Sequence, residues 1–243
     1  MIRKQVLTLS FLGSLILLSL LLFIFYQSPK KTRSPDRVSQ KRHLILGQPN
    51  FIAPPEKNLA KHVEKQWSLK DIEILKAWRE TKGRRDIVVA VIDTGIYAGH
   101  PCLKRNIWKN KKEIPGNKID DDGNGFVDDI YGWNFVSNNN NIQDRHGHGT
   151  HIAGIIAATG KTAATSDCWM IGVAPNVTLM ALKYYDPRNH RNNVKNTIKS
   201  IEYAVKNGAD IINYSGGGPG FNQQERAAIA KAADKGIIFV SAS

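Results

Sequence analysis

The stretch that most constrains the fold of this chain is Ile87–Ile92, an unbroken run of apolar residues rich in β-branched side chains. Such a run is typical of a strand that is buried on both faces of a parallel sheet. Asp93, Thr94 and Gly95 follow at once, at the carboxyl end of the predicted strand. In open α/β sheets, reacting groups gather at that edge. Asp93 is therefore a candidate for chemistry, although an aspartate here could equally turn the chain or cap a helix.

Strands and helices alternate along the rest of the chain. We expect a helix over 69–82, then a loop-rich region over 97–130, and further strands over 131–136, 177–184, 210–214 and 237–241. Between these strands we expect helices that start near 148 and cover 194–207 and 223–235. This alternation predicts an α/β fold built on a parallel sheet.

A second candidate for chemistry is His148, which falls at or just before the start of a predicted helix, within the glycine-punctuated segment His146–Gly154. A histidine that acts as general base needs one ring nitrogen aimed at a nucleophile and the other held by a carboxylate. Asp93 lies far away in sequence, so the two side chains can meet only through the fold. Zinc binding by His146, His148 and His151 is disfavoured, because neither a His-Glu-x-x-His pattern nor a complete tetrahedral ligand set is recognisable.

Together these residues resemble the subtilisin-like serine proteases, or subtilases, from about Gln66 to the end of the chain. The matching stretches occur in the right order and include Gln66–Lys70, Lys76–Trp78, Gly99–Leu103, Gly172–Pro175 and Asp210–Gly217. The resemblance implies a parallel-sheet subtilisin-like fold, truncated after about five strands, and a serine-type endopeptidase with an Asp-His-Ser triad and a polypeptide substrate. Asp93 and His148 would be two triad members. The substrate cleft would be lined by Asn213, Ser215, Gly216 and Gly217.

The third member of the triad is missing from the sequence. No Gly-Thr-Ser-x-Ala stretch occurs, and the sequence ends at Ser243 before the Asn that subtilases use as an oxyanion-hole donor. We therefore expect the chain as given to be an inactive N-terminal part of a peptidase whose chemistry requires no cofactor. A catalytically inactive cell-surface binding module and a decayed gene product are the alternatives.

An acidic segment provides a candidate metal site. It offers oxygen ligands at Asp120, Asp122, Asn124 and Asp128, with Gly125 for a sharp turn. This spacing matches the first nine positions of a calcium loop, but Tyr131 stands where a bidentate Glu is expected, and Asp129 would have to replace it. A structural Ca²⁺ site and a solvated acidic turn both fit this pattern.

Cys102 and Cys168 are the only cysteines. An even count in an exported chain permits a disulfide, although two unrelated small hydrophobic residues would fit as well. The resemblance favours the disulfide: Cys102 stands where subtilases carry a calcium-binding Asp, and Cys168 lies in the loop that completes that site. The resemblance thus implies that a disulfide takes the place of a bound calcium ion.

The N-terminal region predicts export. Residues 6–26 carry no charge and are long enough to span a bilayer as a helix, so we expect contact with a membrane there. Residues 1–27 would form a signal-anchor, which we favour, or a cleaved signal, so the protein would be membrane-anchored or secreted. Residues 28–65 read as a basic linker and 66–243 as the incomplete peptidase domain. Much of the net charge of +13 lies in residues 1–43, and the remainder is spread through the domain without an aromatic-basic pattern, so we expect no nucleic-acid binding.

Overall fold

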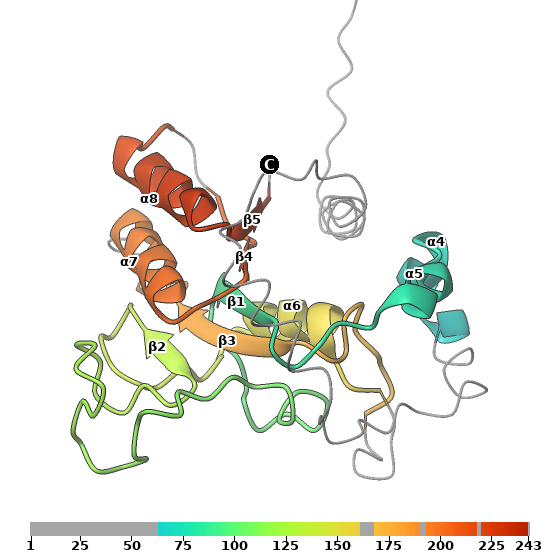
Figure 1. Cartoon of the computed structure of the whole chain (residues 1–243), viewed down its shortest axis with the longest axis horizontal. Helices are drawn as coiled ribbons and strands as arrows, with labels where there is room; N and C mark the ends of the chain where they lie inside the picture. Colours follow the sequence, from blue (N-terminus) through green and yellow to red (C-terminus); the bar gives the residue numbers. More distant parts are fainter. Residues whose placement is uncertain (1–62, 161–167, 190–192, 218–219, 243) are drawn as a thin grey trace, which may run out of the picture.

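The computed structural model describes residues 63–160, 168–189, 193–217 and 220–242. These residues form an α/β fold around one parallel sheet (Figure 1). The strands are β1 (Val88–Asp93), β2 (Gly132–Asn134), β3 (Thr178–Lys183), β4 (Ile211–Tyr214) and β5 (Ile238–Ser241). They lie in the order β2-β3-β1-β4-β5, and each neighbouring pair runs parallel. The predicted α/β fold with a parallel sheet is confirmed.

The central position of β1 explains its continuous apolar sequence. Alternate side chains of a strand point to opposite faces of the sheet, so a strand covered on both faces needs apolar residues at every position. Val89 and Val91 pack on the face covered by α6 (His148–Ala157), together with Ile152 of that helix. Ala90 and Ile92 pack on the other face, beneath α7 (Asn193–Lys206) and α8 (Gln223–Asp234). Figure 1 shows α7 and α8 side by side on that face.

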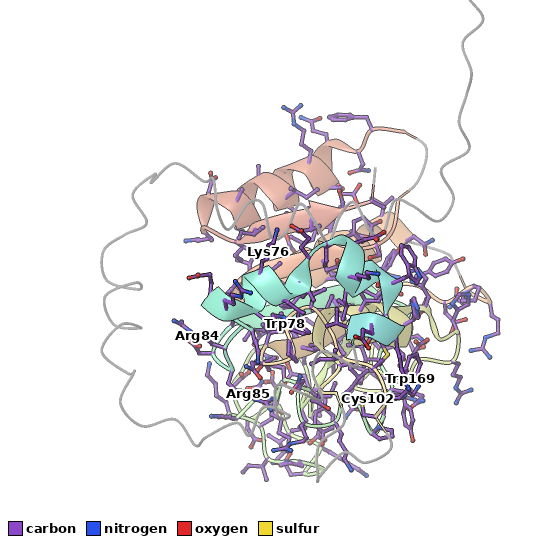
Figure 2. The ribbon with its side chains drawn as sticks, turned by 90° about the vertical axis from the view of Figure 1, so that its right-hand side faces the viewer. Lys76, Trp78, Arg84, Arg85, Cys102 and Trp169 are labelled. Carbon is purple, nitrogen blue, oxygen red and sulfur yellow. A yellow bond between two sulfur atoms is a disulfide. The ribbon has the colours of Figure 1, made fainter. Side chains whose placement is uncertain are left out.

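The single helix expected over 69–82 is wrong in one respect, because two short helices occupy this region. They are α4 (Trp67–Asp71) and α5 (Ile74–Glu80). Glu73 lies between them with a left-handed backbone (φ 50°), which a continuous helix cannot accommodate. Trp78 of α5 is buried and its indole Nε1 donates to the carbonyl oxygen of Val173 at 2.7 Å. The side-on view in Figure 2 shows α4 and α5 running across this side of the molecule.

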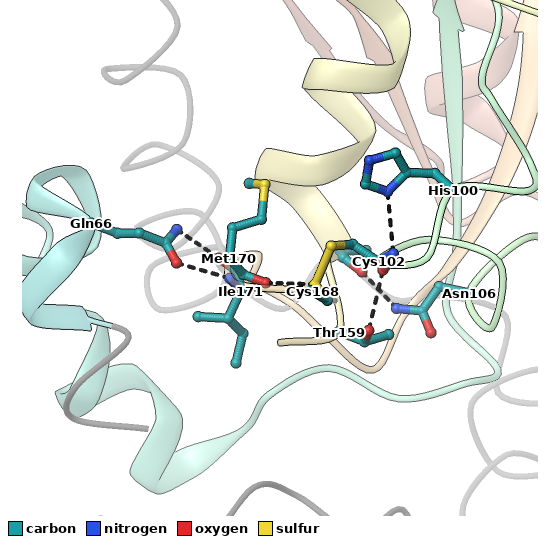
Figure 3. Close-up of a disulfide and its surroundings, with 9 residues drawn as sticks. Gln66, His100, Cys102, Asn106, Thr159, Cys168, Met170 and Ile171 are labelled. Atoms are coloured by element: carbon teal, nitrogen blue, oxygen red, sulfur yellow. Dashed lines mark hydrogen bonds between the residues drawn. A yellow bond between two sulfur atoms is a disulfide. The ribbon is translucent and has the colours of Figure 1, made fainter. Parts of the chain in front are cut away.

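A disulfide joins Cys102 to Cys168, with Cα atoms 5.0 Å apart (Figure 3). Around it, the backbone N–H of Thr159 donates to the carbonyl oxygen of Cys102 at 3.0 Å. The Gln66 side chain exchanges two hydrogen bonds with the backbone of Ile171, at 2.8 and 2.9 Å. The link therefore fastens the loop after β1 to the segment that precedes β3. It closes a loop of 66 residue steps, for which chain entropy gives a stabilisation on the order of 4 kcal/mol.

The remaining expectations about the N-terminal region concern residues outside the described part of the chain. The predicted membrane segment 6–26 and most of the linker 28–65 lie outside the residues that the structure describes. Within the part that the structure does describe, no helix has the length and apolar character needed to cross a membrane.

Candidate active site

Asp93 is the last residue of β1 and is held in place by its own backbone and that of its neighbour. Its carbonyl oxygen accepts a hydrogen bond from the Tyr184 N–H at 3.0 Å, which extends the pairing with β3. Its carboxylate Oδ1 accepts from the Thr94 N–H at 2.7 Å. Only 2% of Asp93 is exposed, so the carboxylate depends on the Thr94 N–H and on the group that faces it.

That facing group is His148, the first residue of α6. Its Nδ1 lies 2.8 Å from Asp93 Oδ1 and 3.0 Å from Oδ2. The side chain keeps 44% of its surface exposed. No described residue forms a hydrogen bond to its other nitrogen, Nε2. The hydrogen bond to Asp93 raises the pKa of His148; burial opposes this shift, and the charges of Asp93 and Asp144 add to it. The pair thus has the geometry of a general base whose cation a carboxylate stabilises.

Gly149 allows this pairing because α6 approaches the end of β1 more closely than a side chain would permit. A Cβ atom at Gly149 would overlap the carbonyl oxygen of Gly95 and lie only 3.0 Å from the Cβ of Asp93. Gly95 has a φ of 110°, a conformation that L side chains rarely adopt. The two glycines therefore let the turn after Asp93 and the first turn of α6 touch through their backbones.

Two residues that our sequence reasoning missed, Asp144 and Thr94, complete the junction. The carboxylate of Asp144 accepts hydrogen bonds from the N–H groups of His146, Gly147 and Thr150 at 2.8 to 2.9 Å. It also accepts from the hydroxyl groups of Thr94 (3.0 Å) and Thr150 (2.7 Å). Asp144 thereby caps α6 although it precedes the helix by four residues. An aspartate just before a helix start is the sequence signal that could have identified it.

These donors decide the charge of Asp144. Burial alone would raise its pKa, but the hydrogen bonds from Gly147, Thr150 and His146 together outweigh burial and lower the pKa. Thr94 links both parts of the site, since its hydroxyl donates to Asp144 and accepts from the Gly149 N–H at 3.0 Å. A carboxylate that stays ionised here holds the start of α6, and with it His148, against β1.

The residues expected to line a substrate cleft lie at the same edge of the sheet. Ile92 of β1 pairs with Tyr214 of β4, so Ser215 follows at the end of β4 that lies beside Asp93. The Asn213 amide Nδ2 donates to Ser215 Oγ at 2.8 Å. Gly216 passes so close to the Tyr184 hydroxyl that a Cβ atom would overlap it, whereas Gly217 is exposed with open space around it. The structure thus brings the predicted cleft residues to the edge that carries the Asp–His pair.

Only part of the predicted calcium set comes together in the acidic segment. Oxygen atoms of Glu113, Asp120 and Asp122 lie within 4.8 Å of one another. Asn124 instead donates from its side chain to Asp129 at 2.9 Å, and Asp128 accepts from the N–H groups of Gly116 and Lys118. Glu113 was missed because it precedes the loop pattern. Three clustered carboxylate groups fit a hard cation such as Ca²⁺ by their chemistry.

Asp129, the predicted substitute ligand, is fully buried and serves a different set of partners. It accepts hydrogen bonds from the side chains of Asn110, Asn124 and Tyr203. Burial raises the pKa of Asp129, and its hydrogen bonds from Tyr203 and Asn110 counteract this only in part. Burial likewise raises the pKa of Glu113, against hydrogen bonds from the backbone of Asp122 and Asp128.

Comparisons with known proteins show the family of this chain. The model of the subtilase family, peptidase family S8, matches residues 84–243. The chain is 37% identical over 183 residues to subtilisin-like protease 1 of Plasmodium falciparum (isolate 3D7), which covers 73% of this chain and 26% of that protein. It is 33% identical over 175 residues to the major intracellular serine protease of Bacillus subtilis (strain 168), covering 71% of this chain and 48% of the relative. The chain thus spans between a quarter and a half of the length of these relatives.

A solved structure supports the fold. The crystal structure of MycP1 with the N-terminal propeptide removed superimposes with a TM-score of 0.51 at 24% identity, covering 72% of this chain and 48% of that one. The family match covers well over half of the chain, so this chain belongs to the subtilase family of serine proteases.

Proposed function

We propose that this chain supplies the Asp–His half of a serine-type endopeptidase centre. The observation that carries the proposal is the contact between His148 Nδ1 and both carboxylate oxygens of Asp93, made by a ring that stays partly exposed. Asp93 would fix the tautomer with the proton on Nδ1 and stabilise the imidazolium. Nε2 would accept the proton of a serine hydroxyl as it attacks the peptide carbonyl, and then deliver it to the departing amine.

The serine would come from outside the described residues. Within them, no hydroxyl group forms a hydrogen bond to His148, and Ser215 is already the acceptor of the Asn213 amide. The polypeptide substrate would lie along the end of β4, with the backbone of Ser215–Gly217 beside it. The alternative function is peptide binding without cleavage. It would apply if no nucleophile joins Asp93 and His148.

The test compares two histidines of one helix. The product of the complete reading frame that contains this sequence is assayed on fluorogenic peptides, together with its His148→Ala and His151→Ala variants. His151 is exposed on α6 and matches His148 in residue type and helix. His148→Ala should reduce kcat/KM at least about 10⁴-fold, as loss of a triad member does. His151→Ala should retain most of the activity.

Three results would separate the alternatives. Labelling by a serine-directed phosphonate that depends on His148 supports the peptidase. Equal cleavage rates in the two variants would contradict the Asp–His assignment. Peptide binding with no cleavage and no labelling would favour the binding module. We expect the 243-residue chain alone to show no turnover.

We also propose a structural Ca²⁺ at Glu113, Asp120 and Asp122. The support is the close approach of three carboxylate groups, each of which accepts a backbone hydrogen bond that holds it in place. The cation would offset their mutual repulsion and take no part in the peptide chemistry. Unfolding measured in calcium and in a chelator tests this site.

Export is the last part of the proposal. The disulfide between Cys102 and Cys168 supports it, because such links persist in oxidising compartments. The uncharged stretch 6–26 would provide the membrane attachment. Fractionation of the expressing cells tests this, since recovery of the protein with reduced thiols in the cytosol would contradict it.

A further inference from the structure

A cavity of about 160 Å³ opens beside the Asp93–His148 pair. Its lining includes Thr94, Arg145, His146, Lys183, Asp186 and Arg188. Thr94 directly follows Asp93, and the ring of His146 lies with its centroid 6.3 Å from that of His148. A single water needs only about 10 to 15 Å³ of such space, so the cavity has room for a side chain or several waters.

The charged groups that line this cavity are mostly cationic. Lys183, Arg188 and Arg145 carry positive charges, and Asp186 carries the only carboxylate among the lining residues. The Asp186 carboxylate is already paired, because the Arg188 guanidinium donates to it from Nε at 3.1 Å and from a terminal nitrogen at 3.0 Å. The Lys183 ammonium lies 3.5 Å from the same carboxylate. Two cations therefore share one anion, which leaves an excess of positive charge.

Asp186 remains an anion in this arrangement. The hydrogen bond from Arg188 lowers its pKa most, burial opposes the shift, and the charge of Lys183 contributes further lowering. Lys183 is almost fully buried and also donates to the carbonyl oxygen of Gln143 at 3.2 Å. These contacts link Asp186, Lys183 and Arg188 along one wall of the cavity.

Arg145 differs from Lys183 and Arg188 because no carboxylate forms an ion pair with it among the described residues. Its side chain is exposed, and it forms no ion pair with any residue that the structure describes. The neighbouring carboxylate, Asp144, uses its oxygens to accept hydrogen bonds from α6 and Thr94. The planar guanidinium group is well suited to bind a carboxylate through two parallel hydrogen bonds.

We propose that this cavity is a subsite for an acidic side chain, Asp or Glu, of the polypeptide substrate, and that Arg145 determines this preference. The inference rests on the proposed function, since it requires a peptide to lie across the Asp–His pair. The ring of His146, in the cavity wall, lies with its centroid 6.3 Å from that of His148, so a side chain in the cavity would belong to a substrate residue near the bond that is cut.

The experiment measures binding, so it does not depend on a nucleophile. The 243-residue protein is titrated into three fluorescein-labelled ten-residue peptides of otherwise neutral sequence, which carry Glu, Gln or Lys at one central position. Fluorescence anisotropy gives each Kd. We expect the Glu peptide to bind about tenfold more tightly than the Gln peptide, as a charge-assisted pair allows, and the Lys peptide to bind most weakly. The preference should weaken at high salt.

Two variants should move this preference in opposite directions, which a loss of folding cannot imitate. Arg145→Gln removes the uncompensated charge and should bring the ratio of the Gln and Glu dissociation constants close to one. Asp186→Asn releases two cations and should raise the ratio. Arg79→Gln is the matched control, because Arg79 is an exposed arginine of α5 away from the cavity, and it should leave the ratio unchanged.

The outcomes distinguish this inference from the function on which it rests. If the Gln and Glu peptides bind equally well, or if Arg145→Gln leaves the preference intact, the acidic subsite is refuted while a peptide-binding cleft stands. If none of the peptides binds, the proposed cleft fails and the subsite fails with it. A preference that Arg145→Gln abolishes and Asp186→Asn enlarges supports the assignment.

Discussion

Two acidic regions of this molecule hold their carboxylates in different ways. At the junction of β1 and α6, Asp93 and Asp144 are surrounded by donors: His148 for the first, and the start of α6 with Thr94 for the second. In the segment after Glu113, several carboxylates lie close together, and the nearest cation in a described ion pair is Lys112, 4.0 Å from Asp122.

The electrostatic result differs accordingly. Hydrogen bonds outweigh burial at Asp144 and lower its pKa, whereas burial prevails at Glu113 and Asp129 and raises theirs. In the first region, donors within the described residues satisfy both carboxylates, whereas the second region has more negative charge than its described partners offset. The comparison teaches that similar clusters of Asp residues serve a rigid junction in one case and a prospective cation site in the other.

The largest expected loss of stability comes from a side chain placed where α6 and the turn after β1 touch. Gly149→Ala should destabilise the protein by about 3 kcal/mol, because the new Cβ would overlap the Gly95 carbonyl oxygen and press on Asp93. Urea unfolding of the two proteins gives the difference. Gly217→Ala is the control: Gly217 has open space around it, and its replacement should change stability by less than about 0.5 kcal/mol. Equal effects of the two substitutions would show that the close approach is not required.

The next effect concerns the acidic segment. Calcium at about one hundred times its Kd should raise the free energy of unfolding by about 2.7 kcal/mol, because the ion binds only the folded state. Glu113→Gln should abolish most of this response, whereas Glu80→Gln, at an exposed position of α5, should retain it. Identical unfolding curves in calcium and in a chelator would contradict the cation site and leave a solvated acidic turn.

A somewhat smaller effect should follow from removing the cap of α6. Asp144→Ala leaves the N–H groups of Gly147 and Thr150 without their acceptor and should cost about 2 kcal/mol at neutral pH. The folded-state pKa of Asp144 is lowered, so its stabilisation is present above the unfolded-state pKa and disappears as the pH falls through the folded-state value.

Urea unfolding at several pH values tests this prediction. The difference between the native protein and Asp144→Ala should shrink on acidification, and Asp234→Ala, at the exposed end of α8, should cost less than about 0.5 kcal/mol throughout. A pH-independent difference would show that the charge of Asp144 does not hold the helix.

The parallel sheet could be predicted because its signals are local and strong. The apolar run before Asp93 and the alternation of strands and helices both follow from residue patterns. The break at Glu73 could not, because a left-handed residue inside a helical pattern is imposed by tertiary packing of Ile74 and Trp78. The second strand is also shorter than expected, Gly132–Asn134 instead of 131–136.

At the candidate site, residue types identified the pair, and geometry supplied the rest. Asp93 and His148 lie in recognisable sequence motifs, whereas the role of Thr94 depends on a hydroxyl group that bridges two segments far apart in sequence. Glu113 joins Asp120 and Asp122 only because the chain folds back across its own loop. Patterns of fixed spacing cannot reveal partners of that kind.

The smallest effect gives the most direct test of the central claim, which is that the Asp93 carboxylate holds His148 as a base. The pKa of His148 is measured by NMR titration of its ring C–H proton, with the signal assigned by its loss in His148→Gln. We predict a pKa above the ordinary value of 6.5 in the native protein and a lower one in Asp93→Asn, which lacks the negative charge. The stabilisation from the pair should be complete below the unfolded-state pKa and disappear as the pH rises through the raised folded-state value. A His148 that titrates at or below its ordinary pKa, or that titrates identically in Asp93→Asn, would contradict the account.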